Sequence, residues 1–142
     1  MTFRCDGPAL GATWSTGAAY RYYSDSWKIK SHTGSVDMSV AVTSDSLISL
    51  SYRGYTQNAA FFYLPSYDTL EGSRYVTHDR ELSRMNSHQL GLRGEYVSTV
   101  GVGSSALTLG ALVAETRYHY PDFLALDRVW ASEFGLTLGL SY

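Results

Sequence analysis

The last ten residues of the chain, Glu133 to Tyr142, alternate strictly between two kinds of side chain. Every second residue is apolar or aromatic, and the residues between them are small or polar. Successive side chains leave a β-strand on opposite faces, so a period of two residues predicts a strand with one apolar face. That apolar set is Phe134, Leu136, Leu138, Leu140 and Tyr142. A strand of this kind has to place one face against an apolar environment.

Five further stretches show the same alternation and are separated by turn-forming residues. The expected strands cover residues 13–23, 27–42, 47–62, 88–97, 106–120 and 129–142. Residues 1–12 contain Gly7-Pro8 and Gly11, and we interpret them as irregular or as the end of a preceding strand. No helical period competes with this pattern, so the sequence predicts an all-β fold, an antiparallel meander of about six strands.

The composition favours a membrane β-barrel over a soluble domain. The 142 residues fit one domain, only 17% of them are charged and 14% are aromatic, against about 25% charged residues in soluble proteins. No run of 18 apolar residues exists, so no transmembrane helix is expected. A barrel needs no such run because half of each strand faces its interior.

Six strands are too few for a closed membrane barrel, since such barrels have at least about eight strands and an open edge in lipid leaves backbone groups unpaired. The first residues also lack the apolar segment of a signal peptide. We therefore expect the chain to be the C-terminal part of a larger barrel. Missing N-terminal strands or other protomers would close it.

Apart from a short turn at residues 24–26, the connections between the expected strands alternate in length. Residues 43–46 and 98–105 are short turns, whereas residues 64–87 form the longest irregular stretch and 121–128 a medium one. Outer-membrane barrels have short periplasmic turns and longer outer loops. This alternation predicts that 64–87 is a long outer loop.

Charged residues inside the expected strands fall mostly opposite the apolar face and are predicted to line the lumen. In the fifth strand the apolar parity contains acidic and basic residues, so either a bulge near Gly110 shifts the parity or these residues stand above the bilayer. A charged lumen selects solutes in a pore, or its arginine–carboxylate pairs fill a small barrel. The predicted lumen-lining set is Arg21, Asp37, Arg53, Arg93, Glu95, Glu115 and Arg117.

Aromatic residues and the final strand carry the other membrane predictions. Tyrosines at the ends of apolar faces are typical of the aromatic girdle at a membrane interface; here they are Tyr20, Tyr22, Tyr52 and Tyr96.

The apolar set of the final strand resembles the signal read by the bacterial barrel-assembly machinery, although a soluble sandwich also contains amphipathic strands. The expected partners are the lipid bilayer and that machinery, and the expected location is the bacterial outer membrane.

Other function classes find little support in the sequence. The net charge of −2 and the absence of a basic patch argue against a nucleic-acid partner. The four histidines lie on separate segments without metal-ligand spacing, so neither a metal nor a cofactor is expected. The single Cys5 excludes an intramolecular disulfide. For catalysis, which we do not expect, the candidate groups would be His78-Asp79, Ser87-His88 and His119 with Asp122.

Several motifs in a fixed order resemble one family of predicted outer-membrane β-barrel proteins, catalogued as domain of unknown function 3570. The resemblance rests on Tyr20-Arg-Tyr-Tyr-Ser-Asp-Ser-Trp27 with Ser31-His32-Thr33, on Ser51-Tyr-Arg-Gly-Tyr-Thr-Gln57 with Ala59-Ala-Phe-Phe-Tyr63, and on Asp79-Arg-Glu-Leu-Ser83 with Leu90-Gly-Leu92. The chain departs from the pattern at Gly54, where a bulky residue is expected. The resemblance implies an outer-membrane location and no particular activity.

Three hypotheses follow. In the first, the chain is part of an outer-membrane β-barrel that is structural or pore-like and is not an enzyme. The second is an outer-membrane hydrolase with its site in the outer loops, and the third is a soluble β-sandwich or lipocalin-like binding protein.

Overall fold

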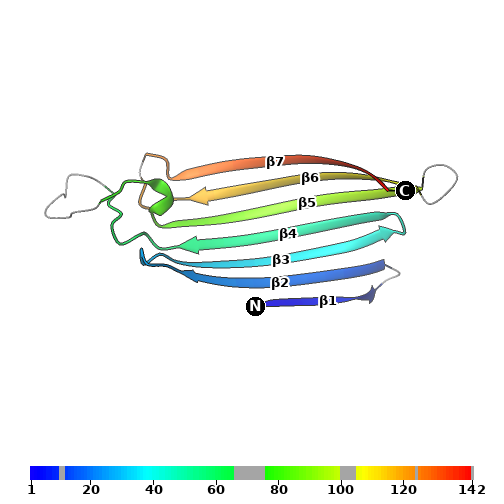
Figure 1. Ribbon diagram of the computed structural model, residues 1–142, viewed down its shortest axis with the longest axis horizontal. Helices are drawn as coiled ribbons and strands as arrows, with labels where there is room; N and C mark the ends of the chain where they lie inside the picture. The colour runs from blue at the N-terminus through cyan, green and yellow to red at the C-terminus, as the bar shows by residue number, and fades with distance from the viewer. Residues whose placement is uncertain (10–11, 66–75, 100–104, 124, 142) are drawn as a thin grey trace.

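Seven antiparallel strands form one sheet in which the strand order is the sequence order (Figure 1). The computed structural model describes residues 1–9, 12–65, 76–99, 105–123 and 125–141. The strands are β1 (Thr2–Ala9), β2 (Ala12–Ser24), β3 (Lys30–Thr43), β4 (Ser46–Gln57), β5 (Met85–Thr99), β6 (Ala106–His119) and β7 (Arg128–Ser141), and a short 3₁₀ helix, η2 (Arg80–Leu82), precedes β5. The predicted all-β antiparallel meander is confirmed.

The number of strands is seven and not about six, because residues 2–9 form β1. Pro8 reads as a strand breaker, yet it pairs with Thr13 of β2. β1 is an edge strand in the described sheet, and an edge strand tolerates proline because one side of its backbone has no ladder to complete.

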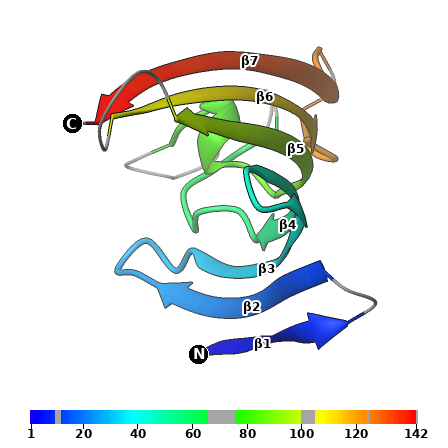
Figure 2. The same ribbon diagram turned by 90° about the vertical axis from the view of Figure 1, so that its right-hand side faces the viewer.

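The sheet is a single curved layer. Viewed along the strands, it bends in an arc from β1 to β7, and η2, in the described part of the connection between β4 and β5, lies within the arc (Figure 2). β1 and β7 each pair with one neighbour among the described strands, so the described sheet is open and is not closed into a barrel.

Three connections gather at one end of the sheet, which we call the loop end: residues 25–29, 58–84 and 120–127. β3 and β5 end, and β4 and β6 begin, at the other end of the sheet, which we call the turn end (Figure 1). The long connection starts and ends earlier than the predicted 64–87, because β4 stops at Gln57 and β5 begins at Met85.

The register is regular across the sheet. Its one shift, a bulge or irregularity, falls between Ala41 and Thr43 in the pairing of β3 with β4. β6 pairs with both neighbours without a shift. The bulge near Gly110, one of two alternatives for the parity of that strand, is therefore absent from the described pairing.

Few apolar side chains are buried. Among the described residues the buried apolar positions are Ile29, Ala60, Tyr63, Ala114 and Tyr120. Four of these, all but Ala114, belong to the connections at the loop end, so the small core belongs to that end and does not run beneath the sheet.

Candidate functional site

One face of the sheet is apolar across β2 to β7 and remains exposed; we call it the apolar face. Directly paired residues of an antiparallel sheet share a face, and pairing across the sheet traces one row at mid-strand. That row is Met38, Leu50, Leu92, Val113 and Phe134. Its members are between 42% and 79% exposed. Exposed apolar surface of this extent is typical of a face that contacts a membrane, another protein or a ligand.

The predicted assembly-signal residues lie on the apolar face of β7. Leu136 is 91% exposed, the highest value among the large apolar residues of the strands. Phe134, Leu138 and Leu140 point the same way, paired in register with apolar residues of β6. Tyr142 lies outside the described residues.

The four predicted girdle tyrosines also share the apolar face. Tyr20 and Tyr22 lie toward the loop end, Tyr52 lies near the middle of β4, and Tyr96 lies toward the turn end. All four are about half exposed. This places aromatic side chains with polar tips near both borders of the apolar band.

Two of these tyrosines are oriented by histidines. The Tyr20 hydroxyl lies 2.6 Å from His32 Nδ1, and the Tyr52 hydroxyl lies 2.7 Å from His88 Nδ1. Neither pairing was predicted from the sequence, because the partners are 12 and 36 residues apart in the chain. Cross-strand pairing brings the partners together, and no local signal predicts it.

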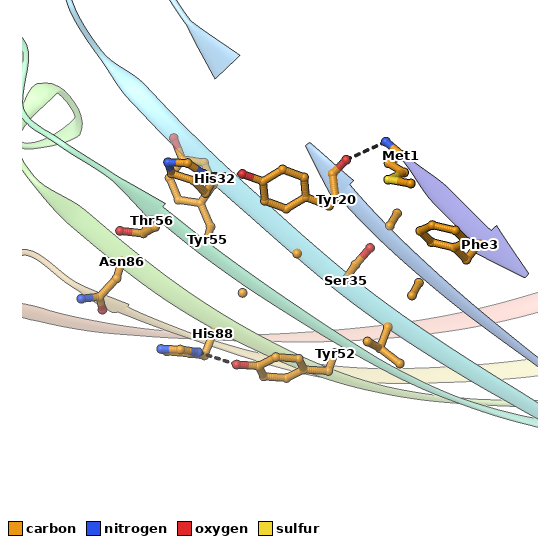
Figure 3. Close-up of a pocket in the computed structure, with 15 residues that line it drawn as sticks. Met1, Phe3, Tyr20, His32, Ser35, Tyr52, Tyr55, Thr56, Asn86 and His88 are labelled. Carbon is orange, nitrogen blue, oxygen red and sulfur yellow. Dashed lines mark hydrogen bonds between the residues drawn. The ribbon is translucent and has the colours of Figure 1, made fainter. Parts of the chain in front are cut away.

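A groove of about 720 Å³ lies between the two tyrosine–histidine pairs (Figure 3). We call it the girdle groove. Its floor is formed where Gly34 of β3 pairs with Gly54 of β4, and Val36 and Ala18 line it as well. The Tyr52 side chain leans over Gly54, so that its hydroxyl oxygen would lie 3.6 Å from a Cβ at that position. This distance is an ordinary van der Waals contact, so it gives no structural reason for glycine at the position where the family resemblance predicts a bulky residue.

The opposite face, on the inside of the arc, is polar, and we call it the polar face. Five members of the predicted lumen-lining set share it: Arg21, Asp37, Arg53, Arg93 and Glu95. Arg93 forms an ion pair with Glu95 on the same strand.

Asp37 approaches the neighbouring strand closely. A Cβ placed on Gly17 of β2 would lie 2.7 Å from the Asp37 carboxylate, a distance that side chains do not adopt. Glycine at position 17 therefore gives this carboxylate room to lie against β2.

Glu115 and Arg117 do not share the polar face, so their grouping with the other five residues is wrong. Glu115 pairs with Leu90 and Arg117 with His88, and both partners lie on the apolar face. Because β6 pairs without a register shift, its odd-numbered residues lie on the apolar face along the whole strand, up to the loop end. The second alternative, polar residues near the end of an otherwise apolar strand, agrees with this register.

Three charged residues of the polar face were absent from the predicted set. Arg4 and Asp6 belong to β1, which the sequence did not identify as a strand, and Glu133 pairs with Ala114. Among the described strands the polar face thus carries four arginines and four carboxylates, a balanced set: Arg4, Arg21, Arg53, Arg93, Asp6, Asp37, Glu95 and Glu133.

The connection between β4 and β5 is anchored by a buried glutamine on the polar side of the sheet. Gln57 Nε2 donates to the carbonyl oxygens of Glu81 at 2.8 Å and Ser83 at 2.9 Å. Tyr55 donates its hydroxyl proton to Gln57 Oε1 at 2.6 Å. These bonds join the last residue of β4 to η2 and hold the connection within the arc.

The same connection joins the other two connections of the loop end. Ala60 and Tyr63 pack with Ile29 from the turn between β2 and β3. Tyr63 donates its hydroxyl proton to the Asp122 carbonyl at 3.2 Å, and Arg84 pairs with the Asp122 carboxylate at 2.9 Å. We call this assembly the loop-end cap.

Two tyrosines of the loop-end cap resist ionisation. Burial raises the pKa of Tyr63, the nearby Asp122 carboxylate raises it further, and a hydrogen bond with Ser83 opposes these effects. Burial also raises the pKa of Tyr120, and Arg80, whose guanidinium lies 4.9 Å from that ring, counteracts it.

The loop-end cap is expected to loosen in alkali. A group whose pKa is raised in the folded state contributes stability that is complete below its unfolded pKa of about 10 and is lost as the pH rises through the folded value. Tryptic cleavage after Arg84 should therefore accelerate above about pH 10, and Tyr63→Phe should reduce the acceleration. An identical alkaline profile for Tyr63→Phe would contradict a role for Tyr63.

The candidate catalytic groups have other neighbours. The Asp79 carboxylate accepts a hydrogen bond from the Glu81 backbone N–H at the start of η2, and the Asp122 carboxylate forms an ion pair with Arg84. His88 shares the apolar face with Tyr52, whereas Ser87 pairs with residues of the polar face.

Among the residues with described positions, no three His, Cys, Asp or Glu side chains gather as metal ligands would. No helix within the same residues has the length and apolarity to cross a bilayer.

A family model described as "Protein of unknown function (DUF3570)" matches residues 8–106. No curated protein and no solved structure matches the chain.

Proposed function

The chain belongs to the DUF3570 family of proteins of unknown function, so we propose a function from its own geometry: it forms part of the wall of a β-barrel in a bacterial outer membrane. The apolar face would contact lipid, and the polar face would line the interior. The barrel would be structural or pore-like, without catalysis.

The single observation that carries this proposal is the exposed apolar face. A soluble domain of about 150 residues buries roughly 70% of the surface of its unfolded chain, and its apolar side chains meet across two packed layers. Here the large apolar side chains of the strands lie outside a single layer, with Leu136 91% exposed. A lipid phase removes this surface from water without a second layer.

Strand length agrees with a membrane span. A transmembrane β-strand needs about 9–11 residues, and β2 to β7 contain between 12 and 15. The surplus lies at the loop end, where histidines, arginines and tyrosines replace aliphatic residues on the apolar face. Interfacial aromatic residues occupy this position in membrane barrels.

The proposal is tested by fractionation of cells that express the protein. We expect it in the outer-membrane fraction, resistant to extraction at high pH, and folded in detergent as a band whose mobility changes on heating. Recovery in the aqueous fraction as a folded monomer would contradict the proposal and favour the soluble β-sandwich.

The pore-like form of the proposal predicts that the polar face controls ion selectivity. Arg21→Gln together with Arg53→Gln removes two of its four cations, so a channel in a planar bilayer should shift its reversal potential toward cation selectivity. The matched control, Arg117→Gln with Arg128→Gln, removes two cations from the apolar face and should leave the potential unchanged. A bilayer that stays silent would contradict the pore and leave a structural wall.

A further inference from the structure

Two hollows of the apolar face meet on β5 and differ in chemical character. The girdle groove holds about 720 Å³ and is lined mainly by apolar and aromatic groups. A second hollow of about 250 Å³, the basic cleft, is lined by Asn86, His88, Arg117, His119 and Arg128. Asn86 and His88 line both hollows. The combined surface is apolar at one end and basic at the other, as an amphiphile requires.

The basic cleft is built on three strands in register. Arg117 lies between His88 of β5 and Trp130 of β7, and His119 lies between Asn86 and Arg128. The Arg117 guanidinium is 5.1 Å from the centre of the Trp130 ring. This stacking orients the guanidinium and leaves its N–H groups available at the rim, because an arginine can stack and form a bidentate contact at once.

Carboxylates oppose these cations only in part. Arg128 Nε contacts Asp127 at 3.5 Å. Glu115, two residues from Arg117 on β6, is the one carboxylate that the described strands place on the apolar face, and it forms no ion pair with the described residues. Arg117 is likewise without a carboxylate partner in the described part of the chain, so its charge can serve an external anion.

We propose that the two hollows together bind a phosphate-bearing lipid, with an acyl chain in the girdle groove and the phosphate in the basic cleft. Arginine recognises phosphate through paired N–H donors, and the charge of the cleft matches an anionic head group. This inference rests on the proposed membrane location. A free phosphate ion would use the basic cleft alone, whereas a lipid uses both hollows.

The test uses the full protein reconstituted in bilayers of a neutral galactolipid, which carries no phosphate, with a single-chain lysophosphatidate as the probe. We expect one probe molecule per site, detected by native mass spectrometry and by quenching of tryptophan fluorescence with a brominated chain. A monoacylglycerol with the same chain should bind more weakly, and inorganic phosphate should compete poorly.

Substitutions then assign the binding to these residues. Arg117→Gln should weaken lysophosphatidate binding about fivefold, and a second substitution, Arg128→Gln, by about another fivefold. Arg117→Lys keeps the charge and should retain most of the affinity, and Glu115→Gln should increase it. The matched control Arg53→Gln removes one cation from the polar face and should leave the affinity unchanged.

The possible failures are distinguishable. Protein that inserts in the bilayer but binds monoacylglycerol as tightly as lysophosphatidate, or is unaffected by Arg117→Gln, overturns the lipid site and spares the barrel. Inorganic phosphate that competes as well as the lipid shows a soluble-anion site and also overturns the inference. Protein that fails to insert overturns the lipid site and the proposed function together.

Discussion

Leu50→Arg is expected to prevent stable insertion of the sheet. Leu50 lies at the middle of β4 on the apolar face, between Met38 and Leu92. A lipid-facing arginine near the bilayer midplane costs about 2–4 kcal/mol, a large part of the 5–15 kcal/mol that typically separates folded from unfolded protein. Urea titration of the protein in lipid vesicles, followed by the heat-modifiable band, measures this loss.

Ser51→Arg is the matched control, one residue further along the same strand. Position 51 lies on the polar face and pairs with Asp37, so the new cation gains a carboxylate neighbour and should cost much less than the one at position 50. Equal losses for the two variants would show that both faces meet the same solvent, which contradicts the membrane proposal.

Gln57→Glu is expected to release the long connection from the sheet. A glutamate has nearly the same shape and keeps an acceptor for Tyr55, but its ionised carboxylate cannot donate to the Glu81 and Ser83 carbonyl oxygens. Each buried carbonyl left without a donor costs about 1–3 kcal/mol. The expected result is a large increase in tryptic cleavage after Arg80 and Arg84 in folded protein.

Gln89→Glu makes the same chemical change on the neighbouring strand β5, also on the polar face. The described residues show no hydrogen bond of the Gln89 side chain, so this variant should retain the protease resistance of the original chain. Equal cleavage in both variants would trace the effect to added negative charge and not to the lost donor.

The sequence predicted the strands well because alternation is a local property. β6 and β7 begin and end within a residue or so of their expected limits. β1 was missed because Gly7-Pro8 reads as a break, and an edge strand tolerates it. For Glu115 and Arg117, the alternation allowed either a bulge near Gly110 or polar residues at the end of the apolar face. The regular pairing of β6 with β5 and β7 agrees with the second alternative.

The hollows and the loop-end cap were beyond prediction from one sequence. The girdle groove exists because Gly34 lies beside Gly54, which are 20 residues apart and become neighbours through the register. The inward position of the long connection depends on the hydrogen bonds of Gln57 to residues more than 20 positions away. Such contacts follow from strand pairing and packing, which composition and period do not specify.

The strand count also restricts how the sheet can be completed. In an antiparallel meander of seven strands, β1 and β7 run in the same direction, so joining them directly would create a parallel pair. An antiparallel seam requires an odd number of further strands between the two edges. A twofold axis perpendicular to the strands would also join each edge strand to an antiparallel counterpart, but it would place the loop ends of the two copies on opposite sides of the membrane. A closed sheet with an even number of strands is therefore antiparallel throughout. A closed sheet with an odd number of strands would contain one parallel pair, with a different hydrogen-bonding pattern.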